Sequence, residues 1–345
     1  MPEFIRIALA GVAALVISLA STPPVKQLAQ RIGAIDIPRD ERRIHKQPIP
    51  RLGGLAIFIG FIMSVLFLAD ITPQLSGILL GSVIIVLIGV VDDIMSLPAI
   101  LKFFIQIIAA LVAVNNGVVI EVFSNPLFFS SAEYVSLEFL SIPVTVIWIV
   151  AITNSVNLID GLDGLAVGVS TISAAVMLVI ALMVADTNVA IVMAALAGAC
   201  LGFLPYNFNP AKIFMGDTGA LLLGYLLSTV SILGLFKFYA VVSFAVPFLI
   251  LAVPLFDTSI AFLRRLLSGR NPMSPDRGHV HHRLIDMGLT QKQAVAVLYT
   301  ISGLLGLAAV VMTTSDKLRV LILGAAALIG AAMVVFIYKH KGKKK

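Results

Sequence analysis

Four polar side chains follow one another at three-residue steps in residues 154–164, between two apolar stretches long enough to cross a bilayer. They are Asn154, Asn157, Asp160 and Asp163. In a helix or a tight helical turn, this spacing brings several side chains to one side. Carboxylate and amide oxygens suit a hard cation and the phosphates that it carries. Gly161 and Gly164 also allow a plain polar turn, but such a turn needs no acids beside so much hydrocarbon.

A second pair of acids, Asp92 and Asp93, ends an apolar stretch just before Pro98, and Lys102 opens the next one. Neighbouring helical residues point about 100° apart, so we expect different partners for the two carboxylates, one a metal and the other a substrate. The acids could simply terminate the helix, but negative charge is favourable at helix N-termini and not at C-termini. Lys102 or a cation is therefore expected to compensate them.

A further acid, Asp217, lies between two glycines immediately before an apolar stretch, where the backbone can approach a ligand closely. Asn207, Lys212 and Phe214 precede it and favour a nucleotide pocket. Asp217 could instead serve only as the N-cap of the following helix. The sequence thus offers three separate groups of acids beside apolar segments.

Basic residues and histidines form two more groups. Lys46 and Arg51 lie where prolines and a glycine pair fix the backbone, and are candidates for holding phosphate. A long polar loop carries Arg277, His279, His281, His282 and Arg283. The histidines could bind zinc, but no cysteine accompanies them and adjacent histidines rarely reach one metal, so phosphate binding is favoured. Asp257, before this loop, is expected to be a buried partner of a nearby cation.

These groups must be positioned by a very hydrophobic chain. Of its 345 residues, 59% are hydrophobic and 12% charged, with a mean hydropathy of +1.06, which excludes an ordinary soluble protein. Apolar runs of roughly 17 to 24 residues match the length of a membrane-spanning helix. They predict one all-α, polytopic membrane domain over residues 1–345, with a small hairpin allowed outside the membrane between the fourth and fifth helices. Eleven transmembrane helices are predicted, centred near Ala13, Ile59, Ile84, Ile108, Ile147, Ala174, Leu196, Leu226, Ile250, Leu305 and Ala327.

The distribution of charge predicts the orientation of the chain. Twenty of its 24 lysines and arginines fall on one side of the eleven predicted helices, which places the N-terminus outside and the C-terminus in the cytoplasm. The expected cytoplasmic segments are 21–54, 92–102, 154–164, 206–219 and 264–293, and the basic tail 339–345 is expected to contact anionic membrane lipid. The net charge of +6 is thereby explained without nucleic-acid binding.

All five polar groups therefore share the cytoplasmic face. A lipid or ion transporter is instead expected to place acids near the bilayer midplane and to show two related halves. A polar site at the membrane surface is typical of an enzyme that joins a water-soluble substrate to one in the lipid. A non-catalytic scaffold is the other alternative.

Together, the motifs resemble the polyprenyl-phosphate N-acetylhexosamine-1-phosphate transferases, membrane enzymes that begin O-antigen, teichoic acid and related glycans. The resemblance runs from His45 to about Gln293. Its motifs are Asp92-Asp93, Asn154-x-x-Asn-x-x-Asp-Gly-x-Asp-Gly164, Asn207-Phe-Asn-Pro-x-x-x-Phe-Met-Gly-Asp217 and His279-x-His-His282. The chain looks like the WecA/TagO branch, which uses UDP-GlcNAc, because Val280 interrupts the histidines. The MraY branch, a phospho-MurNAc-pentapeptide transferase, is the alternative within the family.

The resemblance implies a multi-pass enzyme of the bacterial inner membrane with its active site facing the cytoplasm. Such an enzyme transfers a sugar 1-phosphate, here expected to be GlcNAc-1-phosphate, from a UDP-sugar to undecaprenyl phosphate and releases UMP. The resemblance also implies Mg²⁺, with Mn²⁺ as a substitute, and allows a homodimer.

The resemblance further assigns roles to individual residues. Asp217 is expected to be the principal metal ligand, Asp160 to organise the metal and diphosphate, and Asp92 or Asp93 to act on the lipid phosphate. The positions that match the family's uracil pocket are Phe214, Asn207 and Asp163. The positions expected near phosphates are Lys46, Lys102, His279, His281 and His282. Beside these matched positions, Arg51, Asn154, Asn157, Arg277 and Arg283 are further candidates for contacting substrate.

Overall fold

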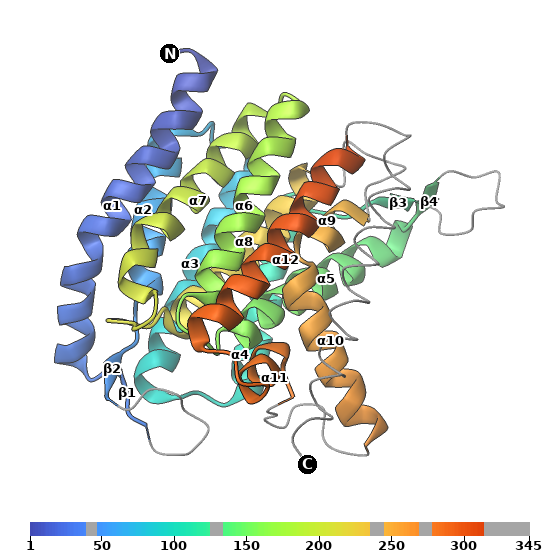
Figure 1. The fold of residues 1–345 in the computed structure, drawn as a ribbon. Helices are drawn as coiled ribbons and strands as arrows, with labels where there is room; N and C mark the ends of the chain where they lie inside the picture. The colour runs from blue at the N-terminus through green and yellow to red at the C-terminus, as the bar shows by residue number, and fades with distance from the viewer. Residues whose placement is uncertain (39–46, 125–133, 235–244, 269–277, 314–345) are drawn as a thin grey trace.

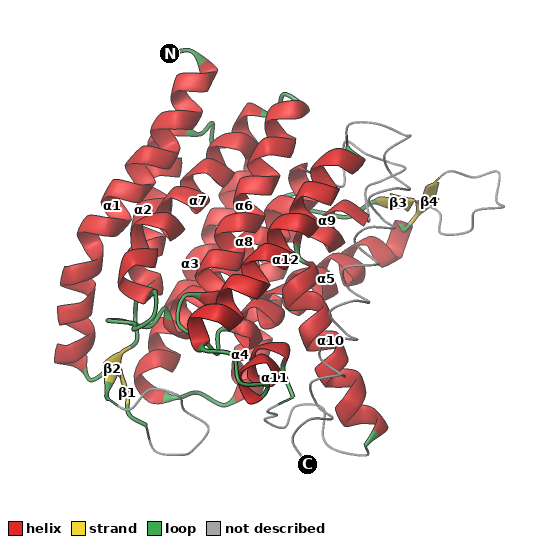
Figure 2. Ribbon diagram, in the orientation of Figure 1, coloured by secondary structure: helices red, strands yellow, loops and turns green. Residues whose placement is uncertain are grey.

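The computed structural model describes residues 1–38, 47–124, 134–234, 245–268 and 278–313, and helices make up most of them (Figures 1 and 2). The α-helices of the described residues are α1 (Glu3–Ile32), α2 (Gly54–Leu68), α3 (Pro73–Met95), α4 (Ala99–Asn115), α5 (Ser141–Ile159), α6 (Leu165–Met183), α7 (Thr187–Asn207), α8 (Gly216–Gly234), α9 (Ala245–Ile250), α10 (Ala252–Leu267), α11 (Val280–Asp286) and α12 (Gln291–Met312).

Seven of these helices are long and apolar enough to cross a membrane: α1, α3, α5, α6, α7, α8 and α12. Helices α2 and α4 are apolar but shorter. The predicted class, a polytopic helical membrane protein, is thus confirmed. Ten of the predicted helix centres lie in helices, and the eleventh, near Ala327, lies outside the described residues, as does the tail 339–345. The total of eleven and the orientation of the termini stay predictions.

Helices extend into the segments predicted as loops. Helix α1 continues through Pro23 and Pro24 to Ile32, so the loop expected from residue 21 begins only at Gly33. Prolines remove helical hydrogen bonds, but the helix here is held by packing on α2 and α7. Helix α3 likewise reaches Met95 and α5 reaches Ile159, because hydropathy marks the apolar part of a helix and not its end.

The predicted ninth span is divided in two. Helices α9 and α10 meet at Leu251, between Pro247 and Pro254. The sequence predicts a kink at these prolines, since each one removes a backbone hydrogen bond. The structure places the break between them.

The N-terminus of α8 lies at the centre of the helix packing. A Cβ atom on Gly54 of α2 would lie 2.0 Å from the backbone nitrogen of Gly219, and one on Gly89 of α3 would lie 2.4 Å from the Cα atom of Thr218. Small residues let membrane helices approach this closely. Glycine therefore brings α2 and α3 against the turn of α8 that follows Asp217.

Two short antiparallel sheets lie at opposite regions of the bundle (Figures 1 and 2). Strand β1 (Ile35–Asp36) pairs with β2 (Ile49–Pro50), and the next residue, Arg51, forms a parallel bridge with Phe214. Strands β3 (Val122–Ser124) and β4 (Tyr134–Ser136) pair between α4 and α5, which confirms the hairpin allowed there. The first sheet is the one that lies at the polar site.

Candidate active site

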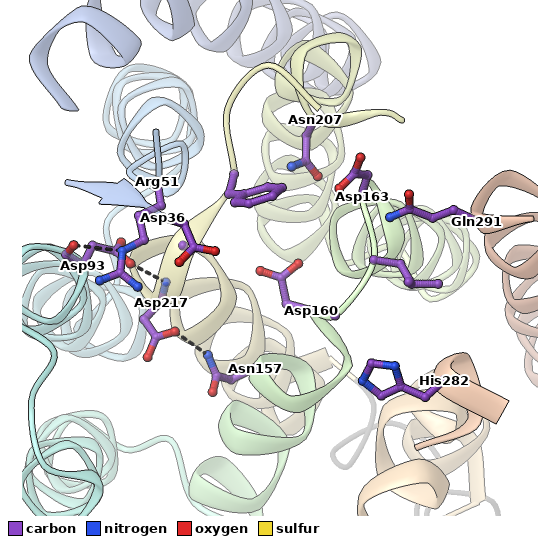
Figure 3. Close-up of a pocket in the computed structure, with 14 residues that line it drawn as sticks. Asp36, Arg51, Asp93, Asn157, Asp160, Asp163, Asn207, Asp217, His282 and Gln291 are labelled. Carbon is purple, nitrogen blue, oxygen red and sulfur yellow. Dashed lines mark hydrogen bonds between the residues drawn. The ribbon is translucent and has the colours of Figure 1, made fainter. Parts of the chain in front are cut away.

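Most of the predicted polar residues within the described chain meet in one pocket, at the end of the bundle where β1 and β2 lie (Figures 1 and 3). Its volume of about 370 Å³ suits a small-molecule ligand. The residues that line it come from distant parts of the sequence: Asp36, Arg51, Asp93, Asn157, Asp160, Gly161, Leu162, Asp163, Asn207, Phe214, Gly216, Asp217, His282 and Gln291.

The segment 154–164 combines the end of a helix with a tight turn. Helix α5 ends at Ile159, and α6 begins after Gly164, which has a left-handed backbone with φ of 78°. Glycine adopts this conformation without strain. The turn puts Asp160 and Asp163 on the pocket wall, with Asn157 on the last turn of α5.

Asp217 is held by residues from two other helices. Its Oδ1 accepts a hydrogen bond from Asn157 Nδ2 at 3.1 Å, and its Oδ2 lies 2.6 Å from Lys102 Nζ. The same ammonium group lies 2.9 Å from Asp92 Oδ2. Lys102 therefore compensates Asp92, as the sequence predicts, and joins it to Asp217.

Asp93 has a different partner from Asp92, as expected from their directions. Its carboxylate accepts from the backbone N–H of Asp217 at 2.9 Å, and from the backbone N–H and the hydroxyl of Thr218 at 3.1 and 2.6 Å. A carboxylate stabilises the N-terminus of a helix in this way. Asp93 of α3 thus caps α8, a role that the sequence suggested for Asp217 itself, and it fixes the backbone of Asp217.

The residues matched to the uracil pocket form one wall of the cavity. Asn207 accepts from Gly164 N and donates to Ile213 O, both at 3.1 Å, so it ties the turn to the loop after α7. Asp163 Oδ2 accepts from Asn209 Nδ2 at 2.9 Å and from Ala211 N at 3.0 Å. These bonds shape the backbone that presents Phe214 to the pocket.

Not all of the basic residues predicted to contact substrate line the pocket. Arg51 lines the pocket, and its Nε donates to Asp93 O at 3.0 Å. Arg283 lies on α11 and does not line the pocket. Lys46 and Arg277 lie outside the described residues.

The three histidines have three environments. His279 Nδ1 lies 3.0 Å from Asp257 Oδ2, so Asp257 has a buried imidazole as its partner. The cation expected beside Asp257 stays a prediction. His281 is buried against Gly161, where a Cβ atom would lie 2.3 Å from His281 Nε2. Burial, then the nearby His282, lowers the pKa of His281 to about 4, so its imidazole is neutral at pH 7. Of the three histidines, His282 alone lines the pocket.

Asn154 does not line the pocket, although it is predicted to contact substrate. It pairs with Gln106 of α4, donating through Nδ2 at 2.5 Å, and also donates to Val150 O at 2.8 Å. Sequence reasoning missed Gln106, although a polar residue one turn after Lys102 in an apolar helix is a signal. It also missed Asp36 and Gln291, which belong to no motif.

Asp160 has the features expected of a cation ligand. Its carboxylate points into the pocket (Figure 3) and accepts no hydrogen bond from any residue in the described part of the chain. Burial, followed by the charges of Asp217, Asp93 and Asp163, raises the pKa of Asp160 to about 8. A bound cation would offset this accumulation of negative charge.

The donor set fits magnesium. Oxygen donors are available from Asp160, Asp217 and the amide of Asn157, and Mg²⁺ commonly takes one or two carboxylates together with water and substrate phosphate oxygens. Across the described ranges, no group of three or more His, Cys, Asp or Glu side chains forms a ready-made metal site. An ion here would therefore share its coordination with substrate phosphate.

The fold and the pocket together define an integral membrane protein with a polar, acidic site at one end of its helical bundle. Residues 75–235 match glycosyl transferase family 4. The chain is 42% identical over 314 residues, 91% of its length and 87% of the relative's, to a probable undecaprenyl-phosphate N-acetylglucosaminyl 1-phosphate transferase of Bacillus subtilis (strain 168).

Two other relatives carry similar names. The chain is 36% identical to a decaprenyl-phosphate N-acetylglucosaminephosphotransferase of Mycobacterium tuberculosis (strain ATCC 25618 / H37Rv), over 96% of this chain and 89% of the relative. It is 30% identical to an undecaprenyl-phosphate alpha-N-acetylglucosaminyl 1-phosphate transferase of Escherichia coli (strain K12), over 81% and 77%. The chain belongs to this family of polyprenyl-phosphate N-acetylglucosamine-1-phosphate transferases, which confirms the resemblance drawn from its motifs.

Proposed function

We propose that the protein transfers GlcNAc-1-phosphate from UDP-GlcNAc to undecaprenyl phosphate, giving undecaprenyl-diphospho-GlcNAc and UMP, as the first membrane step of a cell-envelope glycan. The observation that carries this proposal is the convergence of Asp217, Asp160, Asn157 and His282 in one pocket of a family member. We place the protein in the bacterial inner membrane with this pocket open to the cytoplasm, because the basic residues gather on that side of the predicted spans.

The UDP-sugar is proposed to fill the pocket. Phe214, Asn207 and Asp163 line the wall assigned to uracil, while Arg51 and His282 line the pocket and offer cationic or hydrogen-bonding groups for the diphosphate. Asp217 and Asp160 would hold Mg²⁺, with Mn²⁺ as a substitute. The ion would offset the negative charge of the diphosphate and of the departing UMP.

The lipid phosphate is proposed to approach from the side of Lys102. This ammonium group lies between Asp92 and Asp217 and can reduce the repulsion between two anionic substrates. An oxygen of the lipid phosphate forms a bond to the sugar-bearing phosphorus, and the bond from that phosphorus to UMP breaks. Ionised polyprenyl phosphate is already a competent nucleophile, so a general base contributes less here than in hydrolysis.

The proposal is tested with the purified protein, undecaprenyl phosphate and UDP-GlcNAc in the presence of Mg²⁺. UMP release and a lipid-linked GlcNAc diphosphate in equal amounts are expected. Absence of UMP with every UDP-hexosamine tried would refute the enzyme. Substrate counterflow without UMP would indicate a transporter, and full tolerance of alanine at Asp92, Asp160 and Asp217 would indicate a scaffold.

The sugar is tested by competition among three donors, UDP-GlcNAc, UDP-GalNAc and UDP-MurNAc-pentapeptide, with mass spectrometry of the lipid product. We expect GlcNAc to be preferred over GalNAc, because a site that hydrogen-bonds sugar hydroxyls discriminates against an epimer whose hydroxyl leaves buried groups unpaired. A MurNAc-pentapeptide lipid as main product would move the protein to the other branch of the family. Equal use of GlcNAc and GalNAc would show that the site does not discriminate between the two sugars through hydrogen bonds to their hydroxyls.

A further inference from the structure

Helix α10 carries a buried carboxylate that does not line the pocket. Asp257 is only 5% exposed, and both of its oxygens are engaged by the segment that begins α11. Oδ2 lies 3.0 Å from His279 Nδ1, and Oδ1 accepts from Val280 N at 2.7 Å. Two turns further along α10, Arg264 Nη1 donates to Gly278 O at 3.0 Å. One helix thus holds three consecutive residues, 278–280.

The other face of α10 is apolar and exposed. Phe256, Ile260, Leu263 and Leu267 are all exposed, and their spacing places them along one side of the helix, away from Asp257. An apolar residue would fill the inner position at lower cost than a buried carboxylate, which must be fully hydrogen bonded. A carboxylate at this buried position of α10 therefore indicates that its hydrogen bonds to His279 and Val280 are required.

The held segment continues from α10 to the pocket. The rings of His279 and His281 are nearly parallel, with centroids 5.7 Å apart, and the centroids of His281 and His282 are 4.3 Å apart. His281 packs against Gly161, the residue directly after Asp160, and His282 lines the pocket. A displacement of residues 278–280 would therefore reach both the pocket and the turn that carries Asp160.

We propose that Asp257 is a positioning residue for the transfer reaction: by fixing His279 and the first N–H of α11, it holds His281 against Gly161 and His282 in the pocket. Asp257 itself does not touch the substrates. The inference rests on the proposed function, because His282 serves the UDP-sugar there. It adds a residue from α10 to a site otherwise built from loops and helix ends.

The test compares Asp257→Ala with Asp257→Asn. Alanine removes both hydrogen bonds, whereas an asparagine amide can still accept from Val280 N and donate to His279 Nδ1 in the ring tautomer that carries its proton on Nε2. Since a shift of about 1 Å in a site can cost on the order of 100-fold, we expect kcat/KM for UDP-GlcNAc to fall by about 10-fold to 100-fold in the alanine variant. The asparagine variant is expected to keep most of the activity, with KM for undecaprenyl phosphate unchanged in both. Asp70→Ala is a control for the loss of an ion-paired aspartate far from the pocket, at the other end of the bundle.

A mutant cycle separates positioning from a purely structural role. If Asp257 acts through the histidine segment, adding Asp257→Ala to the pair His281→Ala and His282→Ala should lower activity no further than that pair alone. Additive losses, or equal losses in the alanine and asparagine variants, would overturn the inference. His279→Ala removes the same link from the other partner, and takes the place of Asp257→Ala if that variant does not fold.

Hydrogen exchange of α11 gives a readout without substrate. Asp257→Ala should accelerate exchange across Val280–Asp286, and Asp257→Asn should not. If the wild-type protein releases no UMP, the proposed function fails, while the exchange result still decides whether Asp257 fixes this segment. If the wild-type protein is active and Asp257→Ala matches it in kcat/KM, the positioning role alone is refuted.

Discussion

The two ends of the helical bundle use similar polar side chains in different ways. At the end that holds the N-terminus (Figure 1), Arg6 donates to Leu68 O at 3.1 and 2.7 Å and to Asp70 Oδ1 at 2.9 Å. The backbone of Asp70 exchanges two hydrogen bonds of 2.9 Å with the side chain of Asn188. This cluster, which we call the Arg6 cluster, joins α1, the α2–α3 loop and α7 through groups of the protein alone.

At the pocket end, two carboxylates of the described residues share one ammonium group, and a third accepts no hydrogen bond from them. Lys102 is shared between Asp92 and Asp217, and Asp160 receives no hydrogen bond from the described residues. Polar groups that only hold helices together are satisfied within the protein. The contrast supports the proposal that a cation and phosphate complete the pocket, whereas the Arg6 cluster is complete in itself.

The strongest test of this contrast removes one carboxylate charge from each end. Asp217→Asn keeps the shape of the side chain and its bond from Asn157, but loses the charge that a metal requires, so kcat is expected to fall by about 1,000-fold or more. Asp70→Asn should leave kcat within about twofold, since an exposed ion pair contributes little. UMP release is measured for both variants, with circular dichroism to verify folding. An Asp217→Asn enzyme with normal turnover and unchanged Mg²⁺ dependence would refute the metal assignment.

A second test uses the contact between the central turn and the histidine segment. In Gly161→Ala, the new methyl group would lie 2.3 Å from His281 Nε2, so the ring or the turn must move, and activity should fall by on the order of 100-fold. Adding His281→Ala makes room for the methyl group and should restore part of the loss. Gly303→Ala on α12 is the control, because a methyl group there would meet no atom of another described element within 4 Å. If Gly161→Ala matched this control, the contact would have no part in the reaction.

A smaller effect on kcat is expected from changing the hydrogen-bonded amide pair of Gln106 and Asn154, near Asp217. Gln106 and Asn154 lie one helical turn from Lys102 and Asn157, the two donors to Asp217. Gln106→Leu leaves the Asn154 amide short of a partner, which should cost about 1 to 3 kcal/mol of stability and lower kcat by about 10-fold through misplacement of the donors. Exchanging the two residues, Gln106→Asn with Asn154→Gln, keeps both amides and should recover most of the activity. Thermal unfolding and UMP release are measured for each variant, and a Gln106→Leu protein with unchanged kcat would contradict the positioning of the donors.

The features that could be predicted from the sequence depend on local patterns. Apolar runs located the helices around Ala13 to Leu305 because a membrane-spanning helix needs a long apolar stretch. Acids next to such runs are rare, so Asp160 and Asp217 stood out as candidates and now line one pocket. The hairpin formed by β3 and β4 was visible in its β-branched and aromatic residues.

The features that could not be predicted depend on tertiary packing. Asp93 caps α8, which is more than a hundred residues away along the chain, and nothing beside Asp93 in the sequence specifies that partner. Asn154 has the spacing of a ligand, yet its side chain pairs with Gln106. The sequence of α5 alone does not show that α4 packs beside this side chain. Asp36 lines the pocket from strand β1, which follows α1. The strand lies there because α1 continues past two prolines to Ile32.

The smallest effect on activity is expected from removing the cation of the Arg6 cluster. Arg6→Ala deletes hydrogen bonds to Leu68 O and Asp70 and should lower stability by about 1 to 2 kcal/mol, but leave kcat and both KM values unchanged. Lys102→Ala makes the corresponding change at the pocket end, where it also leaves Asp92 and Asp217 without their shared cation. Thermal unfolding and UMP release of the two variants are compared directly. Each variant loses one cation that bonds an aspartate. A larger fall of kcat in Lys102→Ala would show that the aspartates of the pocket take part in the reaction, whereas Asp70 only holds the helices together. Equal losses of kcat would show that the two ends do not differ in the way proposed.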